Sequence, residues 1–178
     1  MKKSLTYLLL SLSILVTACS KNDEPIDLPI ENASNVVEVS GDIKVNTTWS
    51  ADKIYLMKGF VYVTDGATLT IAPGTIIKGD KVSKGSLIVT RGSKIMAVGT
   101  ADKPIVFTSN LAAGSRNGGD WGGLLILGRA PVNQPGGEVV IEGGLTPTAG
   151  GAASKYTTYG GTDPEDNSGK LVYVRVEY

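Results

Sequence analysis

One segment of the chain recurs after 26 residues, and this repetition restricts the fold more than any other feature of the sequence. Residues 61–69 (VYVTDGATL) align with residues 87–95 (LIVTRGSKI), with Gly66 opposite Gly92. A weaker third copy, residues 125–132 (LILGRAPV), follows after a further 38 residues. Offsets of roughly 20–50 residues are typical of solenoids, in which each unit buries its apolar face against its neighbours.

The composition of the repeating region favours short strands joined by glycine turns. All 23 glycines lie beyond residue 40, and β-branched Val, Ile and Thr are frequent between them. We find no helical spacing after residue 35. Two or three short strands in each unit predict an all-β parallel β-helix, with stacked Val, Ile and Leu inside and glycine and polar residues at the corners. A β-sandwich, which is also built from short strands and regular turns, is the alternative.

Three counts restrict the chemistry. The chain has 17 basic and 17 acidic residues, and this balance argues against a nucleic-acid partner. It has no histidine, which excludes Ser-His and Cys-His nucleophile systems and histidine-ligated metals. Its single cysteine excludes an intrachain disulfide and a thiolate cluster.

Residues 1–18 have the pattern of a secretory signal peptide. Lys2 and Lys3 precede a short apolar run, and small residues lead to Cys19. The sequence Val-Thr-Ala-Cys at residues 16–19 resembles the lipobox of bacterial lipoproteins. This resemblance implies that Cys19 becomes the first mature residue and carries the acyl chains that anchor the protein to a membrane.

The next segment, residues 19–35, has two prolines and little apolar periodicity, so we expect a flexible tether. Its Ser-Lys-Asn-Asp-Glu start, residues 20–24, resembles the export tag of lipoproteins exposed on the surface of Bacteroidota-type bacteria. We therefore expect three parts: a signal peptide (1–18), the tether (19–35) and a β-helix domain (36–178).

Four segments together resemble one family: residues 59–80, 85–109, 119–133 and 160–178. They are similar, in this order, to surface lipoproteins of Bacteroidota-type bacteria with a pectate-lyase-like domain. The resemblance implies a right-handed parallel β-helix, without established catalytic residues or ligand. Chains of this family usually continue beyond the strand at the end of this sequence, so we expect a product truncated at its C-terminus.

The repeat alignment places three charged residues, Asp65, Arg91 and Arg129, at one corner of successive coils. Stacked strands lie about 4.8 Å apart, so Asp65 and Arg91 are expected to pair as a ladder on a solvated edge. The long segment 134–162 is expected to leave the stack as an excursion, and loops on a rigid scaffold often carry recognition.

Two further groups are candidate sites. Asp163, Glu165, Asp166 and Asn167 form the densest cluster of oxygen ligands and predict a calcium site, with an ordinary solvated turn as the alternative. Trp121, which lies among glycines, is a candidate for stacking on a sugar ring, and packing over bare backbone is the alternative. Apart from calcium, no cofactor is expected.

These observations predict a lipid-anchored protein of the outer membrane, exposed on the cell surface, that acts as a binding or structural module. No catalytic constellation stands out in the sequence. The alternative is a carbohydrate-active enzyme, a polysaccharide lyase or hydrolase, whose catalytic coils lie outside this chain. The expected partners are the membrane, through the anchor, and a polysaccharide or another surface protein.

Overall fold

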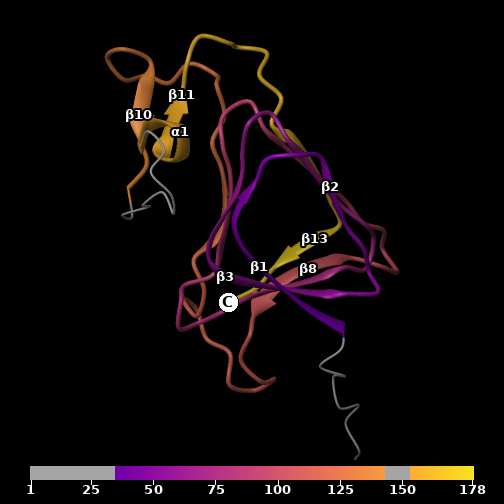
Figure 1. The fold of residues 1–178 in the computed structure, drawn as a ribbon. Coiled ribbons are helices and arrows are strands. Elements are labelled where there is room, and N and C mark those ends of the chain that lie inside the picture. Colours follow the sequence, from indigo (N-terminus) through magenta and orange to yellow (C-terminus); the bar gives the residue numbers. More distant parts are fainter. Residues whose placement is uncertain (1–34, 143–152) are drawn as a thin grey trace, which may run out of the picture. The chain divides into compact units, whose positions relative to one another are not determined.

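The computed structural model describes residues 35–142 and 153–178, and these residues are almost entirely strands and turns (Figure 1). The single helix among them is α1 (Ala153–Thr157). It lies in the excursion, where the sequence has no helical spacing, so the expectation of no helix was wrong for this one short turn. The strands are β1 (Val36–Ile43), β2 (Thr47–Trp49), β3 (Ile54–Val63), β4 (Thr68–Ile71), β5 (Ile76–Gly79), β6 (Ser86–Val89), β7 (Lys94–Val98), β8 (Ile105–Ser109), β9 (Gly123–Ile126), β10 (Glu138–Val140), β11 (Thr158–Gly160), β12 (Gly169–Val172) and β13 (Val174–Val176).

The chain winds into coils with three faces, which Figure 1 shows as three sides. The first face contains the starts of β1 and β3, followed by β5, β8 and β13. The second face contains the ends of β1 and β3, followed by β6 and β9. The third face contains β2, β4, β7 and β12. All strand pairs in these three faces are parallel, which confirms the parallel β-helix and excludes the β-sandwich.

The predicted 26-residue repeat is the offset between paired residues of the second coil (β3 and β4) and the third coil (β5, β6 and β7). Val61 pairs with Leu87 on the second face, and Leu69 pairs with Ile95 on the third. The third copy of the repeat was aligned one residue too far along the chain, because Leu87 pairs with Leu124 and not with Leu125. Residues 124–127 are all apolar, so the sequence pattern does not show which of them points inward.

The interior of the coils is filled by columns of apolar side chains. Tyr55, Ile77 and Phe107 occupy paired positions on the first face and belong to one buried cluster. On the third face, β4 turns Leu69 and Ile71 inward. The removal of these apolar surfaces from water is the main force that stacks one coil on the next.

The second face is covered on its outer side as well. The outer side chains of Tyr62 and Ile88 are fully buried, and they form a second cluster with Leu127 and Tyr156. Tyr156 belongs to α1, so the predicted excursion folds back onto the stack. Within the excursion, β10 and β11 form a two-stranded antiparallel sheet.

Candidate functional site: a charged pocket at one corner of the stack

The corner after β3 is a tight turn that presents Asp65. The amide of Ala67 donates to the carbonyl of Thr64 at 3.1 Å, and both central residues, Asp65 and Gly66, have positive φ (57° and 76°). This is the pattern of a type I′ turn, which only glycine and short polar residues such as Asp or Asn adopt readily. The turn therefore holds the carboxylate of Asp65 at a defined place on the rim.

The corner of the next coil has the same position and a different turn. Ser93 donates to the carbonyl of Thr90 at 3.0 Å, and here only Gly92 has positive φ (81°), as in a type II turn. Thr90 donates its amide to Val63 at 3.0 Å and so ties this corner to the coil below. The alignment of Asp65 with Arg91 at one corner is thus confirmed.

The predicted ladder between Asp65 and Arg91 is wrong, because each pairs with the excursion instead. The Nζ of Lys155, in α1, lies 2.6 Å from Oδ1 of Asp65. The Nη1 of Arg91 lies 2.7 Å from Oε1 of Glu138, in β10, and also donates to the carbonyl of Gly160 at 3.0 Å.

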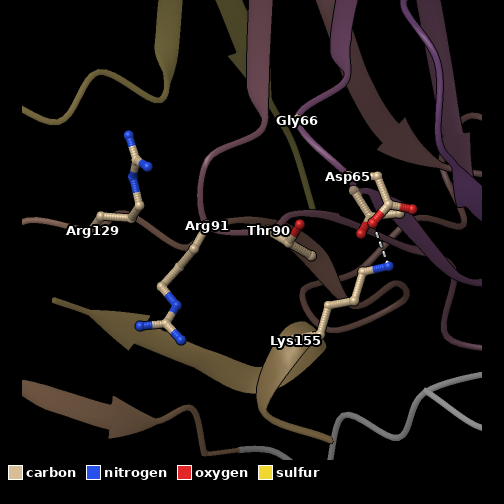
Figure 2. Close-up of a pocket in the computed structure, with 7 residues that line it drawn as sticks. Asp65, Gly66, Thr90, Arg91, Arg129 and Lys155 are labelled. Carbon is tan, nitrogen blue, oxygen red and sulfur yellow. Dashed lines mark ion pairs between the residues drawn. The ribbon is translucent and has the colours of Figure 1, made fainter. Parts of the chain in front are cut away.

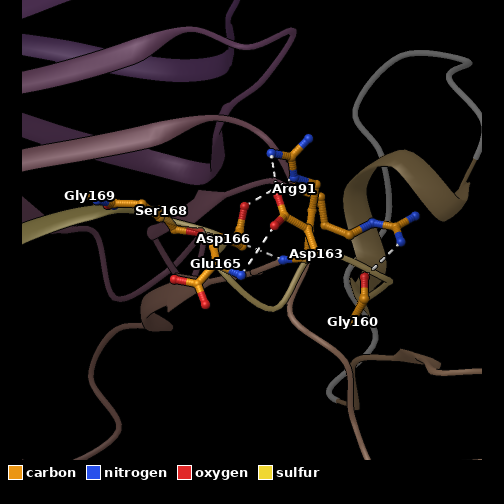
Figure 3. Close-up of polar contacts among 9 residues, drawn as sticks. Arg91, Gly160, Asp163, Glu165, Asp166, Ser168 and Gly169 are labelled. Carbon is orange, nitrogen blue, oxygen red and sulfur yellow. Dashed lines mark hydrogen bonds and ion pairs between the residues drawn. The ribbon is translucent and has the colours of Figure 1, made fainter.

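Arg129, which follows β9, completes the row. Its Nε donates to Oδ1 of Asp166 at 3.0 Å, and its Nη2 donates to Oδ2 of Asp163 at 3.3 Å. Figure 3 labels these two acids and the turn that carries them. The corner charges of three coils therefore meet opposite charges on the excursion and on the turn that follows it, before β12. We call these contacts the charge seam: Asp65 with Lys155, Arg91 with Glu138, and Arg129 with Asp163 and Asp166.

The helix of the excursion is also held by a buried tyrosine. The ring of Tyr156 meets the ring of Tyr62 edge to face at 4.7 Å, and its hydroxyl donates to Oδ2 of Asp42 at 2.8 Å. The hydrogen bond to Asp42, together with burial, raises the pKa of Tyr156. Burial raises the pKa of Tyr62 to about 12. These contacts fix the position of the neighbouring Lys155.

A pocket of about 400 Å³ lies at this corner (Figure 2). Three coils and the excursion contribute its lining, which consists of Thr64, Asp65, Gly66, Thr90, Arg91, Arg129 and Lys155. Its size is in the range of small-molecule sites in proteins. Three of the lining side chains are cations and one is an anion, so the wall is rich in hydrogen-bond donors.

The two threonines of the pocket differ in one respect. Thr90 Oγ1 donates to the carbonyl of Val63 at 2.9 Å. Thr64 Oγ1 is buried and has no hydrogen-bond partner among the residues that the structure describes. Lys155 and the two threonines were missed by sequence reasoning. The Thr-X-Gly sequence shared by the first two copies of the repeat was the available signal for the threonines, whereas no local pattern indicated Lys155.

The loop with the predicted calcium ligands is occupied by internal contacts. Asp166 accepts the backbone amide of Arg129 and the hydroxyl of Ser168, besides the guanidinium, and the hydrogen bond from the Arg129 amide is the main cause of its lowered pKa. The side-chain oxygen of Asn167 accepts the amide of Gly169. In the described part of the chain, no three His, Cys, Asp or Glu side chains are arranged to hold a metal ion. The calcium site stays a prediction.

The ring of Trp121 is almost completely buried. It is 6% exposed, stacks near Phe107 and donates Nε1–H to the carbonyl of Glu177 at 2.9 Å. It also covers Gly79, where an added Cβ would lie 2.4 Å from the Cβ of Trp121. The geometry thus matches the alternative, packing over bare backbone.

The predicted acylation residue, Cys19, lies outside the described residues, as do the signal peptide and nearly all of the tether. In residues 35–142 and 153–178, no helix has the length and apolar character needed to cross a membrane.

The comparisons agree with the fold. The chain matches no curated protein sequence and no solved structure. The family model described as a pectate-lyase-like β-helix domain matches residues 41–178, well over half of the chain. This match covers the coils, the corner pocket and the excursion, and the chain therefore belongs to the pectate-lyase-like β-helix domain family.

Proposed function

We propose that this protein is a binding module of the bacterial cell surface, anchored in the outer membrane through a lipid on Cys19, with the corner pocket as its ligand site. It is proposed as a member of the surface lipoproteins of Bacteroidota-type bacteria that its sequence resembles. The lipobox-like residues 16–19 and the charged residues 20–24 support the anchor and the surface exposure.

The observation that carries the binding role is the composition of the pocket wall. Its charged side chains come from the corners of three stacked coils and from α1, and each is held by a partner. Charged groups on a rigid scaffold bind a ligand with little loss of conformational freedom.

The kinds of partner that we propose follow from the proposed location at the cell surface and from the charge balance of the chain. A polysaccharide or another surface protein is the proposed ligand, and the membrane is contacted through the acyl chains. The equal numbers of acidic and basic residues speak against nucleic acid. Calcium bound by the loop with Asp163, Glu165, Asp166 and Asn167 is proposed as the one cofactor, and would require Arg129 to release its carboxylate partners.

A panel of polysaccharides tests the binding role. The full chain in detergent micelles is incubated with each polysaccharide, and both retention and new chain ends are measured. We expect at least one polysaccharide to be retained without new reducing or unsaturated ends. New ends would overturn the non-enzymatic role and support the alternative, a carbohydrate-active enzyme. Retention of none would overturn the polysaccharide as ligand.

Metabolic labelling tests the anchor. Cells expressing the protein are grown with a radioactive fatty acid, and the labelled protein is compared with the Cys19→Ala variant. We expect label in the native chain and none in the variant. An unlabelled native chain would contradict the lipid anchor.

A further inference from the structure

We infer that the corner pocket binds an oxyanion: a carboxylate, sulfate or phosphate group carried by its ligand. This inference rests on the proposed binding function and names the chemistry of that site. The wall holds three cations, Arg91, Arg129 and Lys155, against the single carboxylate of Asp65. Such a wall favours a ligand with negative charge over a neutral one or a cation.

The acids that hold the two arginines are not part of this wall. Glu138 pairs with Arg91, and Asp163 and Asp166 pair with Arg129, but none of the three lines the pocket. These acids neutralise much of the charge of the guanidinium groups, so the attraction for an oxyanion depends on the N–H donors that the acids do not use. Fixed, planar guanidinium groups suit oxyanions because they offer parallel N–H donors.

Arg129 shows this division of donors within one side chain. Its Nε and Nη2 are used by Asp166 and Asp163. Its Nη1 lies toward the neighbouring corner, where a Cβ on Gly92 would be 3.9 Å away. Gly92 directly follows Arg91, so the Nη1 end of Arg129 lies beside the corner from which Arg91 projects, while the two guanidinium groups themselves point apart (Figure 2).

A second, independent observation comes from Thr64. Its hydroxyl is buried at the pocket and has no partner among the described residues. A buried hydroxyl without a partner is destabilising, and nearly all such groups in folded proteins are satisfied. Because the hydroxyl oxygen has almost no exposed surface, an oxyanion in the pocket would accept this hydrogen bond after a rotation of the Thr64 side chain.

Equilibrium binding of three anionic sugars tests the inference. The full chain is titrated with glucuronate, glucose 6-sulfate and glucose 6-phosphate, with glucose as the neutral comparison. We expect saturable binding of at least one anionic sugar, weakened by added salt, and none of glucose. The order of the three affinities identifies which oxyanion the pocket prefers. Equal binding of glucose, or no binding of any anionic sugar, would overturn the inference.

Two variants locate the binding site, because they are expected to change the affinity in opposite directions. Lys155→Gln removes one cation, and we expect the affinity to fall about tenfold, as for the loss of one charge-assisted hydrogen bond. Asp65→Asn removes the single acid and releases Lys155, so we expect the affinity to rise. Asn tolerates positive φ, so the turn is kept. A purely structural role of Asp65 would lower the affinity instead.

A matched control and the polysaccharide panel separate the outcomes. Arg175→Gln removes an exposed arginine that pairs with Glu177 outside the pocket, and its affinity is expected to be unchanged. If neither Lys155→Gln nor Asp65→Asn changes the affinity for the anion, the site lies elsewhere and the inference is overturned. A polysaccharide retained by the chain while all three anionic sugars fail would overturn the oxyanion and leave the binding function standing.

Discussion

At the scale of single residues, Trp121 shows how a side chain that suggests a binding site in the sequence can serve packing. In the sequence it lies beside Gly122 and Gly123 and was therefore a candidate sugar contact. In the structure its ring covers Gly79 and lies near Phe107. The absence of a Cβ at Gly79 is what allows this contact, because an added methyl would overlap the tryptophan.

We predict that Trp121→Ala destabilises the protein by about 3–5 kcal/mol, because it leaves a cavity beside Phe107. Gly79→Ala is expected to destabilise it as well, through the overlap with Trp121. Urea denaturation followed by circular dichroism measures both effects. Full stability of Trp121→Ala combined with loss of polysaccharide retention would instead show a sugar-contacting tryptophan.

Asp120 is a buried carboxylate that joins two loops. It accepts hydrogen bonds from the hydroxyl of Ser109 at 2.8 Å and the amide of Asn117 at 2.9 Å, and Lys81 lies 2.9 Å from its other oxygen. The hydrogen bond from Lys81, followed by that from Asn117, lowers the pKa of Asp120 to about 2. The charged form is therefore the one that the fold stabilises.

The sign of the pH dependence follows from this lowered pKa. The unfolded chain, in which the pKa of an aspartate is about 3.9, binds more protons than the folded chain between about pH 4 and pH 2. The stabilisation is complete above pH 4 and is lost as the pH falls toward 2. We predict that Asp120→Asn lowers the melting temperature at pH 7 and much less near pH 2. The control is Asp102→Asn, at an exposed turn residue, and an equal effect of the two variants at pH 7 would contradict the role of Asp120.

At the scale of elements, the charge seam attaches the excursion to the stack through ion pairs at three successive coils. The acid at the second coil meets a base, and the bases at the third and fourth coils meet acids. Displacing the excursion by one coil would bring Glu138 to Asp65, where the two carboxylates repel. The change of sign between the second and third coils therefore selects one register, while the apolar contacts of Tyr156 and Ile141 supply most of the attraction.

Exchange of the charges of one pair tests the seam. We predict that Arg91→Glu and Glu138→Arg each increase proteolysis within the excursion, because each places like charges together. The double variant is expected to restore protection, with a coupling of about 0.2–1 kcal/mol that decreases in 1 M salt, as for an exposed pair. Additive effects of the two substitutions would show that the pair does not determine the register.

At the scale of the whole domain, stability is shared between neighbouring coils. Ile77 lies between Tyr55 and Phe107 in the interior column and is fully buried. In a solenoid, each coil contacts only the coils beside it, so damage in a central coil removes support from both sides.

We therefore predict that Ile77→Ala destabilises the domain by about 2–5 kcal/mol in urea denaturation. Val82→Ala, at a residue that is 94% exposed, is expected to change the stability by less than about 0.5 kcal/mol. Hydrogen exchange of the Ile77→Ala variant should quicken in β3 and β8, the neighbours of β5, as well as in β5 itself. Faster exchange confined to β5 would contradict coupling between the coils.

The sequence alone determined the coiled architecture, because each coil is specified by short segments of the chain. The 26-residue repeat, the frequent β-branched residues and the glycine turns are properties of short segments, and they predicted both the parallel β-helix and the alignment of Asp65 with Arg91. The tertiary structure decided the register of β9 and the partners of the corner charges. Four successive apolar residues, 124–127, fit the interior equally well in two registers, so only packing selects Leu124. The pairing of Arg91 with Glu138, 47 residues apart, depends on where a long excursion folds back, and no local period contains that information.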